Sequence, residues 1–287
     1  FICFMATKLT TQDHSRDVAG LTYVYPVLSR RAGGVSVGIN FNVNNACNWR
    51  CVYCQVPDLS VGSAADIDLL KLRKELYFFL DYVDSGRFYS DFSVDPKCRG
   101  IKDISISGNG EPTSLTSFYE AIEAIKEVLE STSNIGQIPL VLITNGSLLH
   151  RKGVRRGLAL WGAIGGQVWF KVDSASLTGR QLINNTMMAV EQMMDNLTFA
   201  AQNCDLWLQT CLFNYKEKIN FDDELRAYHM FLQSARAKVD IQGIYLYTTA
   251  RPSLQPEALA ISPMQGYQLD RVADSIRRLG FKVQVSY

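Results

Sequence analysis

Three cysteines lie close together near the beginning of the chain, at Cys47, Cys51 and Cys54. Their spacings of four and three residues allow one short loop to aim all three thiols at one point. Thiolates are soft ligands that select iron–sulfur clusters, zinc or Cu(I). A cubane [4Fe–4S] cluster normally takes four thiolates. Three thiolates would therefore leave one iron with an open coordination position, where a substrate can bind.

Zinc is the alternative metal for this loop. Structural zinc sites usually have four protein ligands, often arranged as two Cys-x-x-Cys pairs. No histidine lies near the loop in the sequence, and no second closely spaced cysteine pair follows it. The sequence therefore favours an iron–sulfur cluster on Cys47, Cys51 and Cys54 over a structural zinc ion.

The composition is that of an ordinary globular protein, and its 287 residues are 47% hydrophobic and 20% charged. The formal net charge of +1 provides no general attraction to nucleic acid. Seven cysteines without regular pairing argue against a secreted disulfide framework, so we expect a reducing, cytoplasmic location. We expect no membrane span, and the four residues before Met5 are too few for a signal-peptide core.

Strands and helices alternate along most of the chain. Residues 35–42 alternate apolar with small or polar side chains, as expected of a strand with one buried face. Further strands are predicted at about 101–107, 138–144, 167–173, 205–213, 241–247 and 281–285. Helices are predicted at about 66–83, from 113 to 130, shortly after 146, and at 186–203, 222–237 and 263–279.

This alternation implies parallel β/α units joined by right-handed crossovers. Six units and a seventh strand predict an α/β fold, a partial and laterally open (β/α)6 TIM-like barrel. We interpret residues 35–287 as one barrel domain. Residues 1–34 are interpreted as a short, irregular N-terminal extension, and residues 84–100 as a loop.

Nearly every predicted strand has one polar or aromatic face. At 101–107, for example, Ser105 and Ser107 alternate with Ile104 and Ile106. The apolar faces should meet the helices, and the polar faces should line a lumen. Because buried polar groups need hydrogen-bond partners, that lumen should be hydrated or filled by a ligand. An open sheet with one wet face is the alternative.

The cysteine pattern C-x3-C-x-aromatic-C, with Tyr53 at the aromatic position, resembles that of the radical S-adenosylmethionine (SAM) superfamily. This resemblance implies a [4Fe–4S] cluster whose open iron chelates the amino and carboxylate groups of SAM. Over about 35–287 the chain also resembles the branch related to the tRNA wyosine-base synthases, through residues 47–55, 107–113, 142–148, 170–173 and 245–252. Wyosine synthases bind a second cluster through N-terminal cysteines, whereas only Cys3 precedes the motif here.

A glycine-containing turn follows the second predicted strand, at the carboxyl edge where β/α folds bind ligands. Its residues are Gly108, Asn109, Gly110 and Glu111. The glycines allow backbone groups to approach a ligand, and carbonyls and a carboxylate suit a cationic group. The turn resembles the Gly-Gly-Glu segment that binds the SAM amino group in the superfamily, with Asn109 as a departure. A turn that needs glycine only for its conformation is the alternative.

Polar residues at the ends of the next strands are further candidates for SAM contacts. Thr144 and Asn145 end the third strand, and Asn145 either contacts the ribose or carboxylate of SAM or caps a helix. Lys171 and Asp173 share one strand face, and they either hold the SAM carboxylate and ribose or pair with each other. Gln209 is either a polar SAM contact or a satisfied core amide.

Aromatic and basic residues lie near the same edge. Tyr247, with Tyr245 and Arg251, either covers the adenine, meets the substrate or packs in the core. A basic cluster after the third strand marks either a solvated helix start or a place where an acidic substrate approaches, and its residues are His150, Arg151, Lys152, Arg155 and Arg156. Three cysteines need no role beyond packing as small apolar residues, namely Cys98, Cys204 and Cys211.

The resemblance implies a radical SAM enzyme. One electron from the cluster cleaves SAM to methionine and a 5′-deoxyadenosyl radical, which abstracts hydrogen from a substrate in the lumen. A ferredoxin- or flavodoxin-like protein would supply the electron. The branch resemblance favours an RNA base as substrate, and a peptide or protein is the alternative within the enzyme class. The alternative from a different class is a zinc-stabilised binding module that never cleaves SAM.

Overall fold

The computed structural model describes residue 9 and residues 19–29, 33–132, 138–216 and 218–287. An eight-stranded sheet runs through this part of the chain, in the order β1-β2-β5-β6-β7-β8-β10-β12. The strands are β1 (Val24–Ser29), β2 (Gly34–Ile39), β5 (Ile101–Ile106), β6 (Leu140–Thr144), β7 (Gly166–Lys171), β8 (Asp205–Cys211), β10 (Gly243–Tyr247) and β12 (Val283–Ser286). From β2 to β12 all neighbours are parallel, which confirms the predicted β/α alternation.

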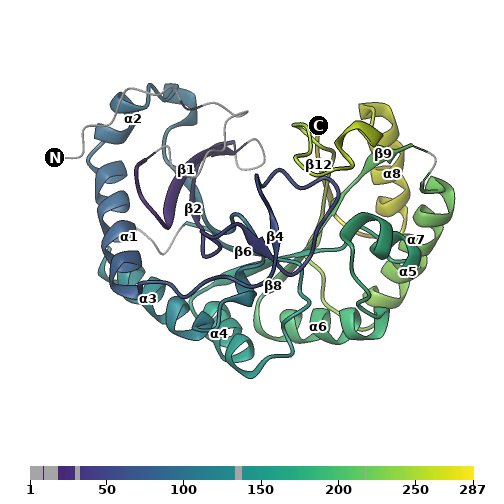
Figure 1. Ribbon diagram of the computed structural model, residues 1–287, viewed down its shortest axis with the longest axis horizontal. Coiled ribbons are helices and arrows are strands. Elements are labelled where there is room, and N and C mark those ends of the chain that lie inside the picture. The colour runs from purple at the N-terminus through teal and green to yellow at the C-terminus, as the bar shows by residue number, and fades with distance from the viewer. Residues whose placement is uncertain (1–8, 10–18, 30–32, 133–137, 217) are drawn as a thin grey trace.

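The sheet curls, and six helices cover its outer face (Figure 1). They are α1 (Leu69–Asp84), α3 (Phe118–Ser131), α4 (Lys152–Ala163), α6 (Val190–Asn203), α7 (Phe221–Arg236) and α8 (Gly266–Arg278). Its edge strands, β1 and β12, are not paired with each other. The predicted partial, laterally open barrel is therefore confirmed.

The described residues before residue 35 include a strand that the sequence analysis missed. Residues 24–29 form β1, which pairs antiparallel with β2 from Val24–Ile39 to Ser29–Gly34. The buried carboxylate of Glu75 on α1 accepts the backbone N–H groups of Thr22 and Tyr23 at 2.7–3.1 Å, which fixes the approach to β1. The interpretation of residues 1–34 as irregular is wrong for this stretch. Cys3 lies outside the described residues.

The strand faces divide as predicted. Apolar residues of alternate positions, such as Ile104 and Ile106 of β5, are fully buried beneath the helices. The opposite positions, including Ser105 and Ser107, line a cavity on the inner side of the sheet. Hydrophobic burial between sheet and helices holds the scaffold together, and it leaves the inner face available for polar groups.

Short elements complete the fold. Residues 84–100, predicted to be a loop, contain the helix α2 (Arg87–Asp91) and a 3-10 turn at Pro96–Cys98. The helix forms because Phe88 and Phe92 bury their rings in the core. Further short elements are β3 (Ala46–Cys47) paired with β4 (Ser60–Val61), β9 (Phe213–Tyr215) paired with β11 (Ile261–Pro263), and the helical turn α5 (Leu177–Gly179).

Candidate active site

A cavity of about 890 Å³ lies on the inner face of the sheet. The cysteine loop follows β2, and Cys47, Cys51 and Cys54 all line this cavity. Burial raises the pKa of the Cys47 and Cys51 thiols to about 12. A bound metal must therefore displace their protons, because thiolates are the ligating form.

The three thiols share one cavity wall. Among the described residues, no three Cys, His, Asp or Glu side chains are grouped closely enough to hold a single metal ion. The expectation that the loop aims all three sulfurs at one point stays a prediction. An iron–sulfur cluster takes one thiolate on each of several irons, so its ligands need not converge as the ligands of one zinc ion do.

Contacts from distant parts of the chain hold the cysteine loop in place. Val52 is buried in a small apolar cluster with Ile183, Cys211 and Phe213, and its N–H donates to the Ile183 carbonyl at 2.8 Å. Arg50 forms a double hydrogen bond with the Glu257 carboxylate, with both N–O distances 2.7 Å. The loop is therefore held by two segments far along the chain, one at Ile183 and one at Glu257.

The segment after β10 adds a third set of contacts. The Ser253 hydroxyl donates to the Val52 carbonyl at 2.7 Å, and the Leu254 N–H donates to the Cys54 carbonyl at 2.9 Å. Gln55 donates to the Arg251 carbonyl at 2.9 Å. Arg251, which was expected to meet adenine or substrate, lines the cavity next to this backbone contact.

The turn 108–111 packs tightly against the start of the cysteine loop. A Cβ on Gly108, whose φ is +154°, would come within 2.2 Å of the Asn40 side chain, and one on Gly110 within 2.1 Å of the Ala46 carbonyl. Asn109 donates its side-chain amide to Asn45 at 2.7 Å. Packing against the protein thus requires glycine at both positions, whether or not a ligand approaches.

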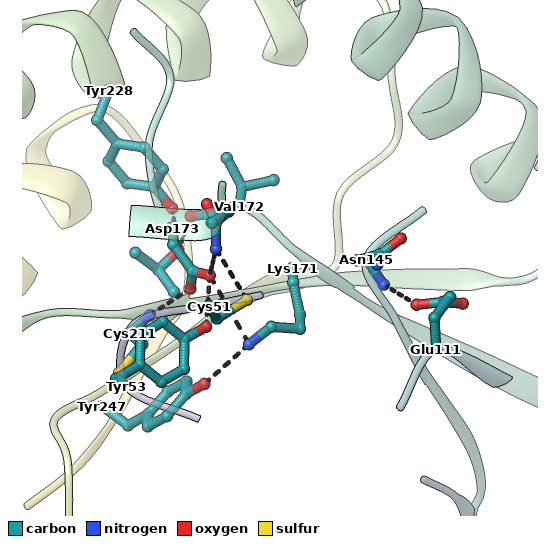
Figure 2. Close-up of polar contacts among 12 residues, drawn as sticks. Cys51, Tyr53, Glu111, Asn145, Lys171, Val172, Asp173, Cys211, Tyr228 and Tyr247 are labelled. Atoms are coloured by element: carbon teal, nitrogen blue, oxygen red, sulfur yellow. Dashed lines mark hydrogen bonds and ion pairs between the residues drawn. The ribbon is translucent and has the colours of Figure 1, made fainter. Parts of the chain in front are cut away.

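Glu111 is a buried carboxylate with four protein donors. One oxygen accepts the Thr144 hydroxyl at 2.6 Å and both the hydroxyl and the N–H of Thr113. The other oxygen accepts the Asn145 N–H at 2.7 Å (Figure 2). Burial raises the pKa of Glu111, and these hydrogen bonds oppose that shift. The carboxylate therefore locks the turn after β5 to the end of β6, as well as lining the cavity.

Asn145 connects β6 to the cysteine loop. Its amide donates to the Asn48 side chain at 2.9 Å, and its oxygen accepts the N–H and hydroxyl of Ser147. The helix-capping alternative is wrong, because Arg151 occupies the N-cap of the following helix α4. Asn48 contributes a contact that the sequence analysis did not assign.

Lys171 and Asp173 form an ion pair with an N–O distance of 3.8 Å, as one of the two alternatives predicted. Asp173 also accepts the Tyr53 hydroxyl and the Cys211 N–H, and the Lys171 ammonium lies 3.2 Å from the Tyr247 hydroxyl (Figure 2). Burial is the largest influence on Lys171 and opposes its charge, but Asp173, together with Tyr247, Cys51 and Cys211, more than offsets it and raises the lysine pKa well above its usual value. Lys171 therefore presents a positive charge to the cavity.

Gln209 lies beside Lys171 on the neighbouring strand and is almost fully buried. Its side-chain N–H group has no hydrogen-bond partner among the described residues, although it lines the cavity. The alternative of a satisfied core amide is thus wrong. A buried donor without a partner is costly, so it fits a site that a ligand fills.

Tyr245 is not part of the cavity wall. Its ring packs between those of Trp169 and Trp207, with ring centroids 4.3 and 4.8 Å away. Tyr247 does line the cavity, as do the other predicted site residues apart from two. The two that do not are Thr144 and Asp173. The three thiols, the positive Lys171 and the open donor of Gln209 together fit a cluster and a polar cofactor.

Most of the remaining candidates lie outside the cavity wall. Cys98 and Cys204 do not line the cavity, whereas Cys211 does. The basic cluster 150–156 lies at the start of α4 in the outer layer, and none of its side chains lines the cavity. Arg155 and Arg156 instead stack on Phe199 and Tyr119. The interpretation as a solvated helix start is the one that the structure favours.

Solved structures share this fold. The structure of native anSMEcpe with bound AdoMet is 15% identical, with a TM-score of 0.55, and the match covers 88% of this chain and 64% of that one. A spore photoproduct lyase variant with dinucleoside spore photoproduct is 11% identical, also with a TM-score of 0.55, over 84% and 74% of the two chains. Archaeal TYW1 reaches a TM-score of only 0.48.

Sequence relatives match parts of the chain. A UPF0026 protein of Synechocystis is 29% identical over 167 residues, which are 58% of this chain and 53% of that protein. The GTP 3′,8-cyclase of Staphylococcus carnosus is 26% identical over 162 residues, 56% of this chain and 41% of that enzyme. A protein named GTPase Obg in Brachyspira hyodysenteriae is 30% identical over 135 residues, 47% and 17% of the two chains. No protein-family model matches.

A curled, laterally open sheet with a three-cysteine loop lining its cavity is also the arrangement of radical SAM proteins, and this chain is similar in fold, and over part of its sequence, to proteins of that superfamily. The enzymes of this superfamily use a [4Fe–4S] cluster and SAM. The chain spans between 17% and 53% of the lengths of the curated relatives described above. No helix in the described part of the chain is long and apolar enough to cross a membrane.

Proposed function

We propose that this protein binds a [4Fe–4S] cluster through Cys47, Cys51 and Cys54 and cleaves SAM reductively. When bound, the cluster would supply one electron to the SAM sulfonium, so that methionine and a 5′-deoxyadenosyl radical form and hydrogen is abstracted from a substrate. The observation that carries the proposal is the placement of all three thiols on the wall of one polar cavity inside a partial barrel. The protein positions the cofactor and excludes side reactions.

The other cavity residues are proposed to hold SAM, each through the groups that it presents. The turn with Gly108, Asn109, Gly110 and Glu111 offers carbonyls and a carboxylate to the ammonium group. Lys171 offers a positive charge to the carboxylate, while Asn145, Gln209 and Tyr247 offer polar contacts from three further strands. Thr144 and Asp173 would not contact SAM themselves. Thr144 positions Glu111, and Asp173 positions Lys171.

Anaerobic reconstitution with iron and sulfide tests the proposal. We expect brown absorbance, about four irons for each chain, and 5′-deoxyadenosine when dithionite and SAM are added. The Cys54→Ala variant should lose the product, whereas the matched variant Cys98→Ala, at a cysteine outside the cavity, should keep it. Tight zinc retention without SAM cleavage would instead support the zinc-stabilised binding module.

For the substrate, we propose an RNA base first. Two similar proteins support this choice, since one is named a GTP cyclase and another is solved with a dinucleoside photoproduct. A peptide or protein substrate is the second candidate, because the basic cluster on α4 is absent from the cavity wall. Anaerobic binding of tRNA and of test peptides at several salt concentrations separates the two, since phosphate contacts make binding salt-dependent. A ferredoxin- or flavodoxin-like protein is proposed as the reductant.

A further inference from the structure

One side chain outside the cysteine loop contacts a cysteine sulfur. Asn184 donates its amide to the Cys51 sulfur at 3.2 Å and to the Asp173 carboxylate at 2.8 Å. Its exposed fraction is only 1%, so water does not compete for these bonds. Both N–H groups of the amide are thus engaged, one by a sulfur and one by a carboxylate.

The backbone around Asn184 is built to present it in this way. The residue ends a π-helical turn, Arg180–Asn184, and the next residue, Asn185, adopts the left-handed conformation with a φ of 52°. Asn185 donates to the Arg50 carbonyl at 2.7 Å, and the Ile183 carbonyl accepts the Val52 N–H. Three consecutive residues therefore hold the cysteine loop, but only the middle one reaches a sulfur.

Asp173 fixes the direction of the amide. The Tyr53 hydroxyl, the Cys211 N–H and the Lys171 ammonium hold this carboxylate in turn. An N–H group aimed at a cysteine sulfur stabilises negative charge on that sulfur. Hydrogen bonds to the sulfurs are among the features that set the reduction potential of an iron–sulfur cluster.

We propose that Asn184 is a positioning residue that raises the reduction potential of the cluster through the Cys51 sulfur. This inference rests on the proposed function, because it requires a cluster on the three cysteines. The donated hydrogen bond favours the reduced, more negative cluster. Without it, reduction should become less favourable, so that a weak protein reductant no longer reduces the cluster fully.

Redox titration of the reconstituted protein, followed by electron paramagnetic resonance, tests the inference. In Asn184→Leu, which lacks the donor, we expect an equilibrium constant for reduction about tenfold lower, or about 59 mV for one electron. In Asn184→Asp, which adds a negative charge beside the sulfur, the decrease should be larger. The matched control Gln181→Leu changes an exposed amide of the same turn, which contacts Met187 and not the cysteine loop, so its potential should stay unchanged.

Potentials of both Asn184 variants equal to that of the wild type, at equal iron content, would overturn the inference and leave the proposed function intact. An equal shift in Gln181→Leu would also overturn it. If neither Asn184 variant retains iron, modification by iodoacetamide decides in the metal-free chain: slower reaction at Cys51 but not at Cys54 supports the contact, because the thiolate is the reactive form and the hydrogen bond stabilises it, and an unchanged rate refutes it. A wild type that binds no cluster refutes the proposed function itself.

Discussion

Two walls of the cavity differ in what their polar groups contact. On β1, β2 and β5 and directly after β5, polar side chains contact neighbours on the same wall: the Tyr25 and Ser107 oxygens are 3.0 Å apart, and the Ser36 hydroxyl donates to the Asp103 carboxylate. On β7, β8 and β10, polar groups reach across to the cysteine loop, as Asp173 does through the Tyr53 hydroxyl. The second wall also carries a charged lysine and the Gln209 donor without a partner.

This difference separates two tasks within one barrel. The wall formed by β7, β8 and β10, called here the cofactor wall, is coupled to the cysteine loop, so changes there should alter the chemistry as well as the stability. The wall formed by β1, β2 and β5, called here the hydroxyl wall, is held mainly by its own hydrogen bonds. Changes there should cost modest stability and leave the cluster unaffected.

The largest expected effect is at the cysteines. Cys51→Ala should abolish cluster binding and SAM cleavage, because a [4Fe–4S] cluster depends on its thiolate ligands. Iron content and 5′-deoxyadenosine formation measure both. Ser36→Ala in the hydroxyl wall is the control and should retain them. Equal losses in the two variants would remove the distinction between the walls.

Asp173→Ala should have the next largest effect. It leaves the partly buried Lys171 ammonium without its buried carboxylate partner, which should cost about 3 kcal/mol, the lower end of the range for breaking a buried ion pair. Urea unfolding of the metal-free protein measures the loss. Asp103→Ala, on the opposite wall, removes the acceptor for Ser36 and should cost about 1–3 kcal/mol. If Asp103→Ala lost more free energy of unfolding than Asp173→Ala, the hydroxyl wall and not the cofactor wall would be the one coupled to the cysteine loop.

Gln209→Leu sharpens the comparison, because stability and binding should change in opposite directions. Replacing a buried donor that has no partner should raise the free energy of unfolding of the metal-free protein by roughly 1 kcal/mol. Binding of SAM to the reconstituted protein should weaken about tenfold, the effect of one lost hydrogen bond. Calorimetry on both forms checks this. Unchanged SAM binding would show that Gln209 does not contact SAM.

The smallest effect is expected at Tyr25→Phe. The change removes one hydroxyl-to-hydroxyl contact with Ser107, which should lower the free energy of unfolding by about 0.5–1.5 kcal/mol. The amount of 5′-deoxyadenosine formed without substrate should remain that of the wild type. A clear loss of this product would mean that the hydroxyl wall also supports SAM.

The parallel strands, the long helices and the cysteine loop could be predicted from the sequence, because each depends on the spacing of neighbouring residues. The parallel strands and the long helices follow from alternation and helical spacing, and the cysteine loop from its own spacing. β1 escaped because its six residues are apolar at nearly every position except Tyr25 and Ser29, and Pro26 breaks the usual strand signal. Such an edge strand becomes visible only through its pairing with β2.

The site residues that were missed have one property in common. Asn184 and Asn48 act through contacts between distant segments, since Asn184 lies 133 residues from Cys51 and Asn48 lies 97 from Asn145. A π-helical turn has no sequence signature that we could use, and nothing local distinguishes Asn184 from Asn185. Conversely, Gly108 and Gly110 were predicted for a ligand, and their tight contacts with Asn40 and Ala46 come from folding.

The pairing of Arg50 with Glu257 spans 207 positions of the chain. During synthesis, the ribosome completes the cysteine loop long before it adds the residues that brace it, and chains grow at roughly 5–20 residues each second. For that interval of about ten seconds or more, the thiols belong to an unbraced nascent segment. Correct metallation should therefore follow release of this region from the ribosome, which makes iron delivery a late event in the maturation of the protein.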